Sequence, residues 1–118
     1  MYTIRKEFHF SSSHQLKGLP PEHPCSHLHG HNYVVIMELR SKHLNNVGFV
    51  RDYRALQPVK DFLDDTWDHR HLNDLMECNP TAENMAFILY TAFKSKIPEL
   101  QAVEVMETPK TCARYEAY

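Results

Sequence analysis

The chain has 118 residues, a length that suits one domain with one hydrophobic core. Its formal charge of −2, without any run of like charges, argues against a protein that binds nucleic-acid backbones or that a basic patch holds on a membrane. No apolar stretch reaches the ~20 residues that span a bilayer, and residues 1–10 lack the apolar segment of a signal peptide.

The cysteine and histidine contents indicate the redox state of the thiols and the kind of chemistry to expect. Cys25, Cys78 and Cys112 are odd in number and follow no disulfide spacing, which predicts reduced thiols and a cytoplasmic location. Histidine occurs nine times and is clustered at 23–31 and 69–71. This enrichment indicates metal or acid–base chemistry.

The first half of the predicted sheet is a hairpin. Residues 2–14 alternate between apolar and polar side chains, which is typical of a half-buried strand that ends at His14. A loop at 15–28, rich in proline, separates it from a second strand at 33–39, where β-branched and aromatic residues dominate. We expect the two strands to pair.

Two helices and two further strands complete the predicted order β-β-α-α-β-β. Helical periodicity follows Asp52, a candidate N-cap, but Pro58 fits only near a first turn, so the start stays open by several residues. A second helix starts at Pro80 or Thr81 and ends before Pro98. Strands at 102–107 and 111–118 follow. We therefore expect one α+β domain over residues 1–118, with an antiparallel sheet and two helices packed on one face.

Three histidines are candidate ligands of one metal ion. His29 and His31 are two residues apart where the chain enters the second strand, and side chains at this spacing point to one side of an extended segment. A hairpin would bring His14 beside them, and Gly30 avoids a β-carbon that could clash. One histidine alone is usually an ordinary surface residue. The combination is typical of a catalytic zinc site with three neutral imidazoles.

Cys25 determines which kind of metal site this would be. As a fourth ligand it would close a tetrahedral, structural zinc site. Away from the metal it would leave an open position for a substrate oxygen, and the thiol could act as a base or a nucleophile. The spacing of CSHLHGH (25–31) is compatible with both arrangements.

Two further groups could belong to an active site. Asp68 directly precedes His69, and a carboxylate beside an imidazole orients the ring for acid–base chemistry, although such pairs are also common at helix ends without a function. Glu107 continues the inward alternation of Val103 and Val105. A carboxylate at that position either forms a salt bridge or binds a ligand.

Six segments carry a wider likeness: FHFSSSH (8–14), CSHLHGH (25–31), GFVRDY (48–53), LDDTWDHRHLND (63–74), NPTAEN (79–84) and VMET (105–108). They span almost the whole chain, and in this order they resemble the 6-pyruvoyl-tetrahydropterin synthase and 6-carboxy-tetrahydropterin synthase family of T-fold proteins. The resemblance implies a T-fold that assembles as a homohexamer of two stacked trimers, with the sheets closed into barrels and the sites at subunit interfaces. Covering the exposed edges of the sheet is a physical reason to expect such an oligomer.

The resemblance also implies roles for individual residues. It makes His14, His29 and His31 the ligands of Zn²⁺ and places the catalytic thiol of Cys25 off the metal. The acid–base pair of Asp68 and His69 reaches the site from a neighbouring subunit. The carboxylate of Glu107 anchors the pterin, because its two oxygens can accept hydrogen bonds from the 2-amino group and N3–H together.

The spacing C-x-x-x-H-G-H between residues 25 and 31 is similar to that of the bacterial carboxy-tetrahydropterin synthases of queuosine biosynthesis. This implies a lyase that converts 7,8-dihydroneopterin triphosphate to 6-carboxy-tetrahydropterin, acetaldehyde and triphosphate. The alternatives are a 6-pyruvoyl-tetrahydropterin synthase, which does not cleave the side chain, and a non-enzymatic zinc- or pterin-binding protein. Gln15 stands where many relatives have a basic residue, which puts a triphosphate contact there in doubt. His27 could be a triphosphate donor, a proton shuttle or a solvated loop residue, and we favour the last.

Overall fold

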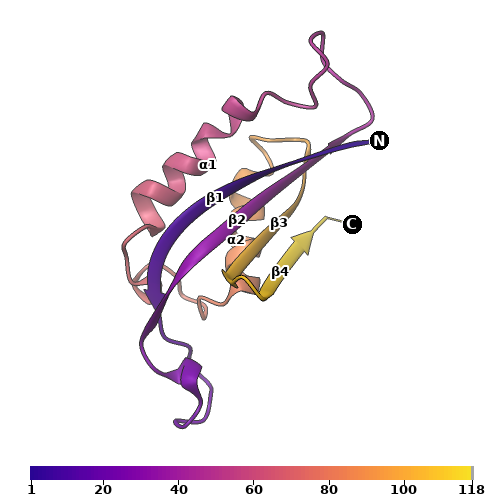
Figure 1. The fold of residues 1–118 in the computed structure, drawn as a ribbon. Coiled ribbons are helices and arrows are strands. Elements are labelled where there is room, and N and C mark those ends of the chain that lie inside the picture. The colour runs from indigo at the N-terminus through magenta and orange to yellow at the C-terminus, as the bar shows by residue number, and fades with distance from the viewer. Residues whose placement is uncertain (118) are drawn as a thin grey trace.

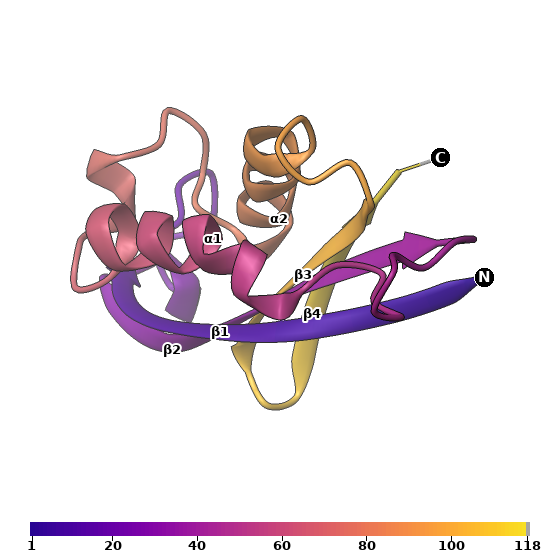
Figure 2. The ribbon, with the colours of Figure 1, turned by 90° about the horizontal axis from the view of Figure 1, so that it is seen from above.

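The computed structural model describes residues 1–117 and shows one antiparallel sheet with both helices on one side of it. The strands lie side by side in chain order: β1 (Tyr2–His14), β2 (His29–Ser41), β3 (Leu100–Thr108) and β4 (Thr111–Glu116). Figure 2 shows α1 (Gln57–Phe62) and α2 (Ala82–Phe93) over the same face. The α+β arrangement expected from the sequence is confirmed; the end of the last predicted strand, at residue 118, lies outside the described residues.

The hairpin of β1 and β2 projects beyond the rest of the sheet. The two strands pair along their whole length, from Tyr2 with Ser41 to His14 with His29. β3 pairs with β2 only from Val34 to Leu39. Residues 29–33 of β2 therefore lie on a two-stranded extension, which appears in Figure 1 as the curved end of the hairpin. The second strand is longer than the predicted 33–39, and the two neighbouring histidines lie inside it.

The first helical segment changes its geometry twice. Asp52 caps a 3₁₀ turn (Tyr53–Leu56) by accepting a hydrogen bond from the N–H of Arg54 at 2.9 Å. Pro58 then occupies the first turn of α1, where its missing N–H costs nothing. A π-helical turn (Leu63–Trp67) follows directly. The expected N-cap is confirmed, and the uncertain start is resolved as a 3₁₀ turn before the α-helix.

The second helix begins as its sequence indicates. The Thr81 hydroxyl accepts a hydrogen bond from the N–H of Asn84 at 3.1 Å, and Glu83 lies in the first turn, where the helix dipole favours a negative charge. Within residues 1–117, no helix is long and apolar enough to cross a membrane.

The core lies between the sheet and the two helices. Alternate residues of the strands pack against one side of each helix, and the contribution of α2 includes Met85, Leu89 and Phe93. Ala55 and Ala92 lie at helical spacing from buried apolar residues and are nevertheless exposed. Alanine is small enough to lie on either side of a helix, so periodicity does not determine its burial.

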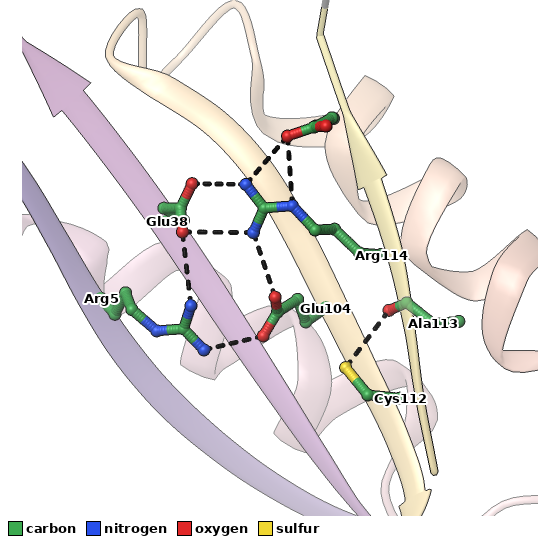
Figure 3. A network of polar contacts seen from close by, with 7 residues as sticks. Arg5, Glu38, Glu104, Cys112, Ala113 and Arg114 are labelled. Atoms are coloured by element: carbon green, nitrogen blue, oxygen red, sulfur yellow. Dashed lines mark hydrogen bonds and ion pairs between the residues drawn. The ribbon is translucent and has the colours of Figure 1, made fainter.

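The face of the sheet without helices carries a network of charged side chains, which we call the Arg–Glu network: Arg5, Glu38, Glu104, Arg114 and Glu116. Each arginine contacts at least two carboxylates, and the side chains come from all four strands (Figure 3). Arg114 Nη2 lies 2.6 Å from Glu38 Oε2, and its Nη1 lies 3.0 Å from Glu104 Oε2. Hydrogen bonds from Arg114 lower the pKa of Glu38, which is only 7% exposed.

Candidate metal centre and its surroundings

Pairing of β1 with β2 brings three histidines together on the helix-covered face; we call them the histidine triad: His14, His29 and His31. The register sets His14 opposite His29, and residue 31 points to the same side because side chains alternate along a strand. One ligand atom from each ring lies within 4.8 Å of the other two. Gly30 permits this close pairing, because a β-carbon there would lie 3.3 Å from the carbonyl oxygen of Ser12.

In His14 and His29, Nδ1 donates a hydrogen bond, and Nε2, which faces the centre of the triad, remains an acceptor without a donor in the described part of the chain. His14 Nδ1 lies 2.8 Å from the carbonyl oxygen of Pro80, and His29 Nδ1 lies 2.7 Å from that of His27. A carbonyl oxygen can only accept, so in each neutral ring Nδ1 carries the proton and Nε2 carries the lone pair. The two Nε2 atoms are 2.9 Å apart. Two lone pairs at that distance repel each other unless a cation lies between them.

Among the described residues, the ring of His31 also has a nitrogen without a hydrogen-bond partner. His31 Nε2 is buried and has no hydrogen-bond partner within residues 1–117, although Glu107 Oε2 lies 3.7 Å away. Burial lowers the pKa of both His14 and His31, which favours the neutral, metal-binding form of each ring. Three neutral imidazoles with unsatisfied nitrogens fit a divalent metal ion that prefers nitrogen ligands, such as zinc.

The elements around the triad fix the orientation of its rings. The backbone carbonyl just before α2, at Pro80, holds His14, whose side chain is fully buried. The Tyr33 hydroxyl lies 3.3 Å from His14 Nδ1, and burial raises the pKa of this phenol. Such second partners fix the tautomer of a metal-binding imidazole. Sequence reasoning missed Tyr33 and Pro80; the alternation along β2 places Tyr33 on the triad's face, whereas nothing local indicates Pro80.

Cys25 lies outside the group of potential ligands. It is partly buried in a 3₁₀ turn (Pro24–Ser26) of the loop that leads into β2, where its N–H donates to His23 Nδ1 at 3.0 Å. The group that could hold a metal consists of the three histidines without this thiol. This arrangement supports an open site over a closed site with four protein ligands. Gln15, by contrast, is engaged in the same loop, since its amide donates to the carbonyl oxygen of Ser26.

Asp68 and His69 form the expected pair, but at the free edge of β1. His69 Nδ1 lies 2.8 Å from Asp68 Oδ2, and Asp68 Oδ1 accepts a hydrogen bond from the N–H of Ser11 at 2.9 Å. The bond from Ser11, followed by that from the His69 ring, lowers the pKa of Asp68. The side chain of His69 is 83% exposed, so it is available to a molecule outside this chain.

The backbone around Asp68 and His69 has two unusual features. The π-helical turn ends immediately before Asp68, and His69 has φ 56°, a conformation that residues other than glycine rarely adopt. The N–H of His69 donates to the carbonyl oxygen of Ser11 at 2.6 Å, which holds the segment against β1. Backbone strain of this kind is retained where neighbouring contacts stabilise it, and it concentrates at functional sites.

Glu107 lies at the end of β3 beside the triad. Its side chain is 24% exposed and lines a hollow of about 240 Å³ together with Glu83 of α2 and Thr111 of β4. The inward alternation that predicted its position is therefore correct. Its carboxylate can act on a ligand in this hollow while lying next to His31.

A four-stranded antiparallel sheet, two helices on one face and three converging imidazoles define a T-fold protein with a candidate metal centre. The family model of 6-pyruvoyl tetrahydropterin synthase matches residues 3–118. The chain belongs to this family.

Relatives and a solved structure agree with this assignment. A 6-carboxy-5,6,7,8-tetrahydropterin synthase of Synechocystis sp. is 34% identical over 98% of this chain and 93% of its own length. The enzyme of the same description from Rickettsia bellii is 26% identical over 92% of this chain and 96% of its own length. The structure of Caenorhabditis elegans 6-pyruvoyl tetrahydropterin synthase superposes with a TM-score of 0.85, at 29% identity, covering 99% of this chain and 96% of that one. The predicted family is thus confirmed.

Proposed function

We propose that the protein is a zinc-dependent 6-carboxy-tetrahydropterin synthase. It would convert 7,8-dihydroneopterin triphosphate to 6-carboxy-tetrahydropterin, acetaldehyde and triphosphate, a lyase reaction that serves queuosine biosynthesis. The observation that carries the proposal is the histidine triad, whose unsatisfied Nε2 atoms lie beside a partly exposed carboxylate. The description of the Synechocystis and Rickettsia relatives favours the carboxy-synthase reaction.

The triad and Glu107 would together hold the substrate. The carboxylate of Glu107 accepts hydrogen bonds from the 2-amino group and N3–H of the pterin, a two-point contact that needs both of its oxygens. Because Glu107 Oε2 lies 3.7 Å from His31 Nε2, a pterin held there places its side chain next to the triad. Zinc held by the three histidines would supply a Lewis acid for the hydroxyl groups of that side chain.

Cys25 and His69 would move protons during loss of the triphosphate, tautomerisation and cleavage of the carbon–carbon bond. Cys25 is suited to this because it is partly buried, free and outside the ligand group. His69 is suited because Asp68 binds Nδ1 and so leaves Nε2 for the substrate.

The site is proposed to be shared between subunits of a hexamer made of two trimers. The triad lies on the helix-covered face, whereas His69 follows the outer edge of β1 and is 83% exposed. One subunit would supply the triad, Cys25 and Glu107, and its neighbour would supply Asp68 and His69. β1 and β4 are the two edges of the sheet, and pairing them between copies would satisfy their free backbone groups.

A 6-pyruvoyl-tetrahydropterin synthase is the second candidate, favoured by the likeness to the Caenorhabditis elegans structure. The two reactions share the early steps and differ in cleavage of the side chain. The test is to incubate the zinc-loaded protein with 7,8-dihydroneopterin triphosphate and to identify the products. We expect 6-carboxy-tetrahydropterin and acetaldehyde in equal amounts. A pyruvoyl product without acetaldehyde would establish the second candidate, and no consumption of substrate would reject both.

A further inference from the structure

A polar hollow of about 550 Å³ lies at the outer edge of β1; of its lining residues, the enzymatic roles assigned above account only for His31 and His69. We call it the outer hollow; its lining includes Ser11, Ser13, Asn32, His69, Arg70 and His71. Ser11 pairs with Asn32 across the hairpin, and both alternate with the histidines of the triad. Their side chains therefore lie on the opposite face of the sheet from the triad.

The segment 69–71 forms one wall of the outer hollow because backbone hydrogen bonds and one isolated parallel bridge hold it against β1. The N–H of Ser13 donates to the carbonyl oxygen of Arg70 at 3.0 Å, and Ser13 and His71 form a parallel bridge. His69 and His71 both line the outer hollow, one at each end of this segment.

Three side chains of the outer hollow, those of Asn32, Arg70 and His71, have N–H groups that can donate to a ligand. The Ser11 hydroxyl donates to Asn32 Oδ1 at 2.6 Å, which leaves the amide N–H groups of Asn32 for a ligand. The Ser13 hydroxyl lies 2.9 Å from His71 Nδ1; when it donates there, the ring proton is on Nε2. Within residues 1–117, the guanidinium of Arg70 makes one long hydrogen bond, 3.3 Å to the carbonyl oxygen of Asp65.

This composition selects an anion. The Arg70 guanidinium, the Asn32 amide and the His71 ring can donate hydrogen bonds into the outer hollow, and no carboxylate is among its lining residues. The nearby carboxylate of Asp68 is already bound to the N–H of Ser11 and to the His69 ring. Arginine recognises phosphate through paired N–H groups, and hydrogen bonds to a charged acceptor are the strong ones. A volume of about 550 Å³ is in the range of small-ligand sites and leaves room for several phosphoryl groups in a row.

We propose that the outer hollow binds the triphosphate of the substrate, with Arg70 and His71 as its principal contacts. The proposal rests on the function proposed above, which supplies a substrate that carries a triphosphate. His69 lines the same hollow. A substrate whose reacting side chain lies against His69 would therefore direct its triphosphate toward Arg70 and His71, whichever subunit supplies the metal.

The test measures binding of inorganic tripolyphosphate to the zinc-loaded full chain, in which any binding of the anion at the zinc ion is the same for the native protein and the variants. We expect the double variant Arg70→Gln, His71→Gln to bind it at least roughly tenfold more weakly than the native protein, since each substitution removes a charged or polar contact. The matched control, Arg40→Gln, His43→Gln, changes the same residue types at exposed positions outside the hollow and should bind like the native protein.

A second measurement separates loss of phosphate binding from loss of structure. Zinc-loaded native protein and double variant should bind unphosphorylated 7,8-dihydroneopterin equally well. Equal tripolyphosphate affinity in the double variant and the native protein would overturn the proposal, and so would a parallel loss of both ligands. Because tripolyphosphate binding requires no turnover, failure of the proposed reaction would be seen separately, in the product analysis.

Discussion

The two faces of the sheet carry two polar clusters that differ in whether their polar groups find partners within the chain. On the helix-free face, each charged side chain of the Arg–Glu network contacts at least one opposite charge, with three carboxylates around two guanidinium groups (Figure 3). The shortest of the pairs given above joins Arg114 and Glu38 at 2.6 Å. On the helix-covered face, His14 of the histidine triad is fully buried and the other two rings are partly buried. Within residues 1–117, the Nε2 atoms of the triad have no hydrogen-bond donor. The same hairpin contributes to both clusters.

This difference indicates which cluster requires a ligand from outside the chain. A buried polar group without a partner costs free energy, so the triad destabilises the metal-free fold and is explained by a ligand. The Arg–Glu network is complete without a ligand, so its contribution is to the stability of the fold. The predictions below test this division between a site for a ligand and a cluster for stability.

The largest effect is expected from His29→Ala, which removes a triad member that is partly exposed and so leaves the core intact. Zinc content should fall to background, and turnover of 7,8-dihydroneopterin triphosphate should fall by roughly 10²- to 10⁴-fold, because the Lewis acid is lost. Metal analysis and a product assay measure the two quantities.

The matched control is His27→Ala. This histidine is exposed and close in sequence, and it serves the triad only through its backbone carbonyl. It should retain both zinc and turnover. Zinc that stays bound to His29→Ala, or that is lost from His27→Ala, would contradict the ligand set.

The next effect is expected from Cys25→Ala. Since the thiol lies outside the ligand group, zinc content should be unchanged, while turnover should fall by roughly 10²- to 10⁴-fold through loss of a proton-transferring group. Cys78→Ala, a change at an exposed cysteine, should leave both quantities unchanged. If zinc disappears together with the thiol of residue 25, the site is closed and structural, and the protein binds zinc without being this enzyme.

The sequence predicts the convergence of the triad because the three histidines lie on two strands of a single hairpin. Two histidines at strand spacing and one at the end of a paired strand converge through the alternation and register of a single hairpin. The length of β2 was underestimated because histidine, glycine and asparagine at 29–32 are poor indicators of a strand; pairing with the full length of β1 makes the segment extended. The family resemblance and the T-fold were predicted correctly.

The Arg–Glu network could not be predicted, because its partners are far apart in the sequence. Arg5 and Glu104 are separated by 99 residues, and Arg114 and Glu38 by 76. Their meeting depends on the strand order and on the irregular registers of β3 with both of its neighbours. The sequence does not predict the π-helical turn before Asp68 either, since an α-helical periodicity also describes residues 55–67.

The smallest effect is expected from Glu38→Gln, which breaks the Arg–Glu network and leaves the triad intact. The substitution should lower the free energy of unfolding at pH 7 by about 1–3 kcal/mol, because a buried charged hydrogen bond to Arg114 is lost. Zinc content should not change. Glu77→Gln, at an exposed position, should shift the free energy of unfolding by less than about 0.5 kcal/mol.

The pH dependence of the Glu38→Gln effect follows from the direction of the pKa shift. Arg114 lowers the pKa of Glu38 in the folded protein below its ordinary value of 4.5, so the unfolded chain takes up the proton first. The stability that Glu38 contributes is complete above pH 4.5 and is lost as the pH falls through the lower pKa of the folded state. The difference between native protein and variant in urea unfolding should therefore be constant from pH 7 to about 5.5 and shrink below 4.5. A difference that persists unchanged in acid would mean that the variant's loss comes from packing and not from the charge of Glu38.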